Sequence, residues 1–279
     1  MACTAFVLGG GGVLGAVEVG MLRALARADI TPDLIVATSI GAINGAMVAA
    51  DPTPAVTDQL VRLWAAPEMG EVYGESIPRQ LRRFATRTHL HSPLPLRRLL
   101  EKALPGKFED LGIPLHLGSV CVERAAESWF STGPLLPAVM AAAAVPGLLP
   151  PVDLDGEHYV DGGIVNSLPI ARAVELGAQD IYALHVGRLD KPLSPPQRPW
   201  EVAQTAMEIG RRARLARDLA SLPEGVSVHV LPVGEGNDRD DNPWAYRDAA
   251  GLRRRVSAAY AASRDYLAAQ RDGVRNPPR

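Results

Sequence analysis

The sequence of 279 residues has little cysteine, few aromatic side chains and no marked excess of charge. Two cysteines, Cys3 and Cys121, cannot build a disulfide framework, which favours a reducing, cytoplasmic setting. Aromatic residues make up 5% of the chain, so aliphatic and small side chains must fill the core. The net charge of −2 argues against nucleic acid as a partner, because domains that bind it usually carry a basic excess.

Segments that would direct or anchor the chain to a membrane are also scarce. No positively charged region precedes the first apolar stretch, so we predict no signal peptide. Residues 129–152 carry no charge and are long enough to cross a bilayer, but five prolines interrupt them. We interpret this segment as a buried turn–helix–turn, and we expect a cytoplasmic protein that is at most peripheral at the membrane.

The sequence does contain an alternation of strand-like and helix-like segments. Short apolar runs predict strands at 4–8 and 31–39, and each is followed by a segment with apolar residues at helical spacing or small residues throughout. Such alternation implies parallel strands joined by helical crossovers. Residues 53 to about 110 are different, because they read as helical, turn-interrupted and basic.

Four consecutive glycines follow the first strand, in the stretch FVLGGGGVLG. Gly10, Gly12 and Gly15 fit the spacing of a dinucleotide-binding loop, but the second strand lacks the acidic residue that would bind a ribose. The ending G-K-[ST] of a phosphate-binding loop is also missing. The third interpretation is an oxyanion hole, in which backbone N–H groups stabilise a developing negative charge. An oxyanion hole requires a nucleophile nearby.

Ser39 offers that nucleophile at the next strand-to-helix turn, in ATSIG. Ala37 and Gly41, two positions away on either side, are small, as expected of a nucleophile elbow with a strained serine. The first two strands of a β-α-β unit often lie side by side, so Ser39 and the glycine loop should share one edge of the sheet. The alternative is that Ser39 is an ordinary helix N-cap.

Two kinds of base could activate Ser39. Asp161 begins a D-G-G turn, and a partly desolvated aspartate there can accept a proton, although such turns are also common for structural reasons. The rival is a Ser–Asp–His triad with His185 or His229, both of which lie in strand-like runs. No pair of histidines has metal-ligand spacing, so we expect no metal.

Three motifs therefore stand in one order: GGGVLG at 10–15, ATSIG at 37–41 and DGG at 161–163. This order resembles the patatin-like phospholipase family, whose pattern is G-G-G-x-[KR]-G, then G-x-S-x-G, then D-G-[AG]. The similarity extends to AAAAVPGLLPPV before the aspartate and NSLPIARAVELGA after it. It covers about residues 5–190.

The resemblance implies a single patatin-like hydrolase domain over 1–279. Its architecture would be a three-layer α/β/α sandwich with a central, mostly parallel sheet and the helical insertion near 53–110. The C-terminal helices and a strand over 198–270 would complete the domain. A frayed tail is expected over 271–279, because these residues are polar and proline-rich.

The resemblance also implies a serine lipid acyl hydrolase that needs no cofactor and acts on lipid or other acyl esters. Ser39 would be the nucleophile, Asp161 the base, and the backbone amides of Gly10, Gly11 and Gly12 the oxyanion hole. The motifs that support these residues comprise Gly15, Ala37, Gly41, Gly162 and Gly163.

Two positions depart from the family pattern, and they leave substrate preference and rate open. Leu14 replaces the usual basic residue, and Ala37 replaces the first glycine of the elbow. A catalytically weak lipid-binding module is therefore the non-enzymatic alternative.

A basic segment from Glu71 to Lys107 carries eight basic and three acidic residues. It would be either a lid that meets anionic lipid headgroups or an ordinary solvated face. The apolar side chains beside its arginines are Leu81, Phe84, Leu94, Leu96, Leu99 and Leu100.

Overall fold

The computed structural model describes residues 2–11, 15–66, 69, 72, 88–186, 192–235 and 249–275. Its strands are β1 (Thr4–Leu8), β2 (Leu34–Thr38), β3 (Leu115–Cys121), β4 (Ala126–Phe130), β5 (Val152–Leu154), β6 (Glu157–Asp161), β7 (Asp180–Leu184) and β8 (Ser227–Val230). Its α-helices are α1 (Gly15–Arg27), α2 (Ile40–Ala50), α3 (Val56–Ala65), α6 (Leu94–Ala103), α7 (Leu135–Ala142), α8 (Ile170–Glu175), α9 (Pro199–Ala220) and α10 (Ala249–Arg275). Short 3-10 turns η2 (Phe108–Asp110) and η3 (Gly162–Ile164) complete the described elements.

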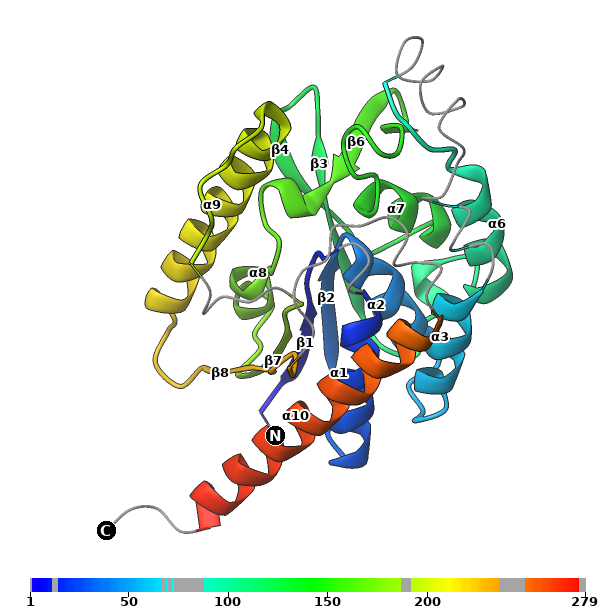
Figure 1. The fold of residues 1–279 in the computed structure, drawn as a ribbon. Helices are drawn as coiled ribbons and strands as arrows, with labels where there is room; N and C mark the ends of the chain where they lie inside the picture. Colours follow the sequence, from blue (N-terminus) through cyan, green and yellow to red (C-terminus); the bar gives the residue numbers. More distant parts are fainter. Residues whose placement is uncertain are drawn as a thin grey trace.

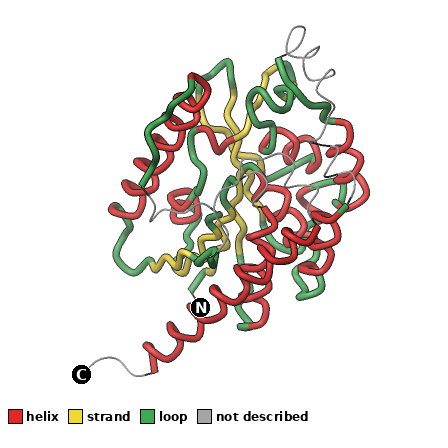
Figure 2. Tube along the Cα trace, in the orientation of Figure 1, coloured by secondary structure: helices red, strands yellow, loops and turns green. Residues whose placement is uncertain are grey.

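The strands form one sheet in the order β5-β6-β3-β2-β1-β7-β8, and β4 also pairs with β3. The run β3-β2-β1-β7-β8 is parallel throughout, whereas β4, β5 and β6 are antiparallel to their neighbours. β1 and β2 lie side by side, as the sequence predicted. Figures 1 and 2 show the sheet between two groups of helices, with α8 and α9 on one side and α1, α3 and α10 on the other.

Both faces of the parallel strands are buried, because helices cover each face. In β1, Phe6 and Leu8 pack into the larger core with residues of α1, α2, α3, α7 and α10. The alternate residues Ala5 and Val7 pack into a second core with residues of α8 and α9. The prediction of a three-layer, mostly parallel α/β/α sandwich is confirmed.

Local sequence signals explain several boundaries. The hairpin of β5 and β6 turns at Asp155 and Gly156, whose φ angles of 53° and 84° suit a tight two-residue turn. At the other end of the chain, α10 continues to Arg275, so it includes residues 271–275 of the expected tail. The Arg271 guanidinium donates a hydrogen bond to the Ala28 carbonyl, which ties this end of α10 to the residues after α1.

The expected helical insertion contains α3 and α6, but residues 71 and 73–87 of the basic segment, including Leu81 and Phe84, lie outside the described residues. Within α6, Leu96 and Leu100 are buried in the core and Leu99 packs against it, so they do not form the apolar surface that we expected. Leu94 is 53% exposed. None of the helices in the described part of the chain is long and apolar enough to span a bilayer.

Candidate active site

Ser39 lies between the end of β2 and the start of α2 in an unusual backbone conformation. Its φ of 55° and ψ of −130° fall outside the regions that non-glycine residues normally occupy. Ser39 is the N-cap residue of α2, yet its hydroxyl makes no capping hydrogen bond. The hydroxyl instead donates to Asp161 Oδ2 at 2.5 Å. The side chain is therefore committed to a partner outside the helix.

The residues around Ser39 are small because other backbone segments approach closely. A Cβ atom on Gly41 would lie 2.6 Å from the Leu8 carbonyl oxygen, so no side chain fits there. Ala37, by contrast, is a fully buried residue within regular strand β2. The first position of the elbow thus accommodates alanine without requiring the conformational range of glycine.

Asp161 ends β6 directly beside Ser39, and both residues are buried, with 3% and 7% of their surfaces exposed. Its second carboxylate oxygen, Oδ1, accepts a 2.6 Å hydrogen bond from the Gly163 N–H in η3. A Cβ atom on Gly163 would lie 2.9 Å from this oxygen, so the turn leaves room only for glycine. We call these two residues the Ser39–Asp161 pair.

Burial raises the pKa of Asp161 from its ordinary value of 3.8 to about 6. Three groups partly oppose the rise by favouring the carboxylate: the Ser39 hydroxyl, the Gly163 amide and the charge of Arg211 on α9. A carboxylate with this pKa is ionised at neutral pH, yet it is more basic than an exposed aspartate.

One short segment holds the backbone of both members of the pair. The Ser39 N–H donates to the Ala142 carbonyl at the end of α7, and the Asp161 N–H donates to the Ala144 carbonyl two residues later, each at 3.0 Å. Both alanines are buried. Small side chains let this segment pass close to the two turns.

The glycine loop lies against Ser39, as predicted. A Cβ atom on Gly10 would stand 3.1 Å from the Ser39 Cβ atom. The Gly10 N–H donates to the Ser167 carbonyl at 2.8 Å, so in this structure it is engaged within the protein. Gly12 and Leu14 lie outside the described residues, and Gly11 is partly exposed. The oxyanion hole therefore stays a prediction, and it depends first on amides other than that of Gly10.

A buried polar network beneath the glycine loop was missed by sequence reasoning. The Asn44 side chain donates to the Gly15 carbonyl and to Glu18, and it accepts a 2.9 Å hydrogen bond from Trp64. Burial raises the pKa of Glu18 to about 8, so its neutral form predominates at pH 7. The sequence signal was an asparagine within a helix of otherwise small and apolar residues.

Neither candidate histidine for a triad lies between Ser39 and Asp161. The strand register places His229 three strands from β2 and four residues towards the opposite edge, roughly 20 Å from Ser39. His185 follows β7 at the same edge as Ser39, but two strand spacings, about 10 Å, separate it from β2.

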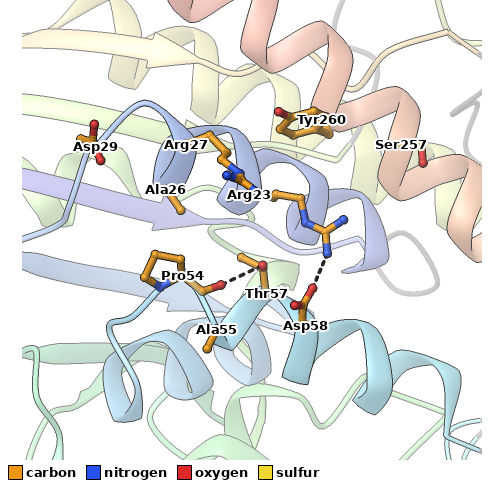
Figure 3. A pocket seen from close by; sticks show the side chains of 10 residues that line it. All are labelled: Arg23, Ala26, Arg27, Asp29, Pro54, Ala55, Thr57, Asp58, Ser257 and Tyr260. Carbon is orange, nitrogen blue, oxygen red and sulfur yellow. Dashed lines mark hydrogen bonds and ion pairs between the residues drawn. The ribbon is translucent and has the colours of Figure 1, made fainter.

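An open groove of about 760 Å³ lies elsewhere, between α1, the start of α3 and α10 (Figure 3). Arg23 on one side of it makes a 2.7 Å ion pair with Asp58 on the other. Tyr260 of α10 lines the groove as well. The groove includes neither member of the Ser39–Asp161 pair, so it is a separate feature of the surface.

Comparison with known proteins shows the family to which the chain belongs. Residues 6–174, well over half of the chain, match the family described as "Patatin-like phospholipase", and the chain belongs to this family. The human protein called "Patatin-like phospholipase domain-containing protein 6" is 32% identical over 193 residues, which cover 67% of this chain and 14% of that protein. "Lysophospholipase nte1" of Aspergillus terreus is 29% identical over 184 residues, covering 66% of this chain and 12% of that protein. The chain thus matches only a small part of these longer relatives.

Among solved structures, a human GIVD cytosolic phospholipase A2 bound to a fluorophosphonate inhibitor superposes with a TM-score of 0.51. The alignment covers 98% of this chain and 60% of that one at 14% sequence identity. At this identity the likeness shows a common fold.

Proposed function

We propose that this chain is a serine hydrolase that cleaves acyl esters of lipids, with Ser39 as nucleophile and Asp161 as base. The observation that carries the proposal is the 2.5 Å hydrogen bond between Ser39 Oγ and Asp161 Oδ2, made by two buried residues at a strained strand-to-helix turn. Membership of the family supports a lipid acyl ester as the substrate class. The direct bond between serine and aspartate supports a two-residue mechanism over a triad, because no imidazole fits between the two side chains.

The mechanism follows from these positions. Asp161 accepts the Ser39 proton while Ser39 Oγ forms a bond to the ester carbonyl carbon, and negative charge moves onto the carbonyl oxygen. Amides of the glycine loop at Gly11 and Gly12 would bind that oxygen. When the carbonyl re-forms, the C–O bond to the alcohol breaks and the alcohol leaves with the proton from Asp161.

Release of the acid repeats these steps with water. Asp161 takes a proton from a water molecule while the oxygen of that water attacks the carbonyl carbon of the acyl-enzyme. Collapse of the second tetrahedral intermediate breaks the bond to Ser39 Oγ, which recovers the proton. The fatty acid is released and both residues return to their starting states.

The test is hydrolysis of p-nitrophenyl esters of increasing acyl length by the natural chain and by Ser39→Ala. We expect the variant to lose at least about 1,000-fold in kcat, because alanine has no hydroxyl to attack the ester. A fluorophosphonate probe should label the natural chain at Ser39, as located by peptide mass spectrometry. Full esterase activity in a correctly folded Ser39→Ala protein would refute the proposal.

The basic segment is proposed to contact anionic lipid surfaces through α6. Arg98 and Lys102 are exposed there, beside the exposed apolar Leu94. Co-sedimentation with vesicles should then be stronger for anionic than for neutral lipid. Equal binding to both vesicle types would contradict the role of charge.

A further inference from the structure

Arg211 of α9 reaches the turn that carries Asp161, although it lies beyond the residues that match the family. Its Nε donates a 2.7 Å hydrogen bond to the Gly163 carbonyl, and 23% of its side chain is exposed. We propose that Arg211 is a positioning residue of the hydrolytic site: it holds the Gly162–Gly163 turn and thereby fixes the Asp161 carboxylate against Ser39. This inference rests on the proposed function of the Ser39–Asp161 pair.

Gly163 connects the guanidinium to the carboxylate. Its N–H donates to Asp161 Oδ1 at 2.6 Å, and its carbonyl accepts from Arg211, so one residue is held from both sides. Two successive glycines have more backbone freedom than any other pair of residues. A turn built from them needs restraints to define the position of the carboxylate. The Gly162 carbonyl accepts hydrogen bonds from Val165 and Asn166 within the segment, and the Arg211 guanidinium restrains Gly163 from outside it.

α9 is itself firmly placed, so it can act as the support for this contact. Arg214, one turn beyond Arg211, makes a 3.1 Å ion pair with Glu127 of β4. Leu215 is buried in the second core against the sheet. Arg211 and Arg212 both approach Glu208 one turn earlier, at 3.9 and 3.0 Å. The helix therefore presents the guanidinium from a fixed position.

The charge of Arg211 adds an electrostatic effect to this mechanical one. In the described part of the chain, the groups that act on the Asp161 carboxylate are the Ser39 hydroxyl, the Gly163 amide and Arg211, with Glu208 next to the arginine. Arg211 is the charged one of the three, and it lowers the pKa of Asp161 against the effect of burial. Removal of this charge should therefore raise the pKa of Asp161 above about 6.

The experiment compares Arg211→Gln, Arg211→Lys and the matched control Arg212→Gln, whose arginine shares the Glu208 contact but does not reach Gly163. The titration of Asp161 is followed by NMR in protein with ¹³C-labelled aspartate, with Asp161→Asn identifying the signal. Ester hydrolysis is measured against pH in parallel. We expect Arg211→Gln to shift the titration upward by about half a pH unit or more. We also expect it to lower kcat about 10- to 100-fold with little change in KM.

Arg211→Lys keeps the charge but loses the planar donor group, so it should leave the titration near its natural value and restore kcat only in part. Arg212→Gln should stay within about twofold of the natural chain in kcat. Equal losses in the Arg211 and Arg212 variants, or an unchanged titration in Arg211→Gln, would overturn the inference. Should Arg211→Gln fail to fold, an unchanged kcat in Arg211→Lys would overturn it too.

Failure of the proposed function gives a different pattern. The natural chain would then not hydrolyse esters, or Ser39→Ala would hydrolyse them equally well. The NMR titration needs no turnover, so it would still show whether Arg211 sets the environment of Asp161.

Discussion

Two clusters of polar side chains lie in different parts of the same sheet, and they differ chiefly in backbone conformation. The first cluster, which we call the His229 cluster, comprises Asp180, Tyr182, His229 and Tyr266. His229 Nε2 lies 3.2 Å from Asp180 Oδ1, and its ring stacks on Tyr182 at 4.9 Å between ring centroids. These residue types often transfer protons. The cluster is nevertheless built on regular strands and a helix.

The Ser39–Asp161 pair has fewer ionisable groups but a far more constrained setting. Ser39 has a positive φ, Gly41 leaves no room for a side chain, Gly10 packs tightly against Ser39, and both members of the pair are buried. Backbone strain persists only where the surrounding structure enforces it, and it concentrates at functional sites. The comparison favours the Ser39–Asp161 pair as the proposed reactive site, because its backbone is constrained, whereas the His229 cluster is recommended only by its residue types.

Of the substitutions that distinguish the two clusters, Asp161→Asn should have the largest effect on kcat. The variant keeps the shape of the side chain but cannot accept the Ser39 proton, so we expect kcat to fall about 100- to 10,000-fold. Steady-state kinetics at pH 8 will measure this. A loss of less than tenfold would contradict the role of Asp161 as base.

The same substitution should stabilise the protein at high pH. The pKa of Asp161 is higher in the folded state, at about 6, than its ordinary 3.8. The folded state therefore binds the proton more tightly, and burial of the charge lowers stability progressively as pH rises from about 4 to above 6. At pH 8 this cost corresponds to about 3 kcal/mol, which Asp161→Asn should recover.

Urea denaturation of both proteins at pH 8 and pH 4.5 checks this prediction. The difference in the free energy of unfolding should be much smaller at pH 4.5, because Asp161 is then largely protonated in the folded protein. A difference that does not depend on pH would contradict the assigned pKa.

Gly163→Ala tests whether the geometry of the turn matters apart from its chemistry. The added Cβ atom would lie 2.9 Å from Asp161 Oδ1, so the carboxylate must move away from Ser39. We expect kcat to fall about tenfold, since small displacements of catalytic groups slow reactions strongly. Gly106→Ala is the control, because a Cβ atom there meets nothing within 4 Å. Equal activity of the two variants would argue against this role of the turn.

The smallest effect is expected from the His229 cluster. His229→Gln should leave kcat within about twofold of the natural value, because this side chain lies roughly 20 Å from Ser39. The melting temperature should fall by a few degrees through loss of the stacking on Tyr182. A loss of activity like that of Asp161→Asn would reverse the comparison and favour a triad.

Much of the fold was predictable because its signals are local. Apolar runs and helical spacing fix the type of each element, and tight turns such as Asp155–Gly156 follow from residues with positive φ. Ser39 and Asp161 were nominated for the same reason, since small residues must surround each turn within a few positions. These signals need no knowledge of distant contacts.

The rest depends on contacts between distant residues. Arg211 acts on a backbone carbonyl 48 positions earlier, and a carbonyl leaves no mark on the sequence. Leu96 and Leu100 of α6 lie beside arginines in the sequence, which suggested a surface position, but in the folded chain both are buried in the core. Glu18 and Asn44 pair across two helices that only the folded sheet brings together.

The carbonyls of Ala142 and Ala144, which accept hydrogen bonds from the backbone of Ser39 and Asp161, act as a spacer between these two residues. They help to set the distance between Ser39 and Asp161 from a third segment, and they do so with backbone atoms that every amino acid possesses. Substitution within this segment therefore leaves the gap intact as long as the new side chain fits. Insertion or deletion of one residue between Ala142 and Ala144 would shift one of these carbonyls relative to the other, and with it Ser39 relative to Asp161. The residue types in this segment can therefore change during evolution, but its length cannot readily change.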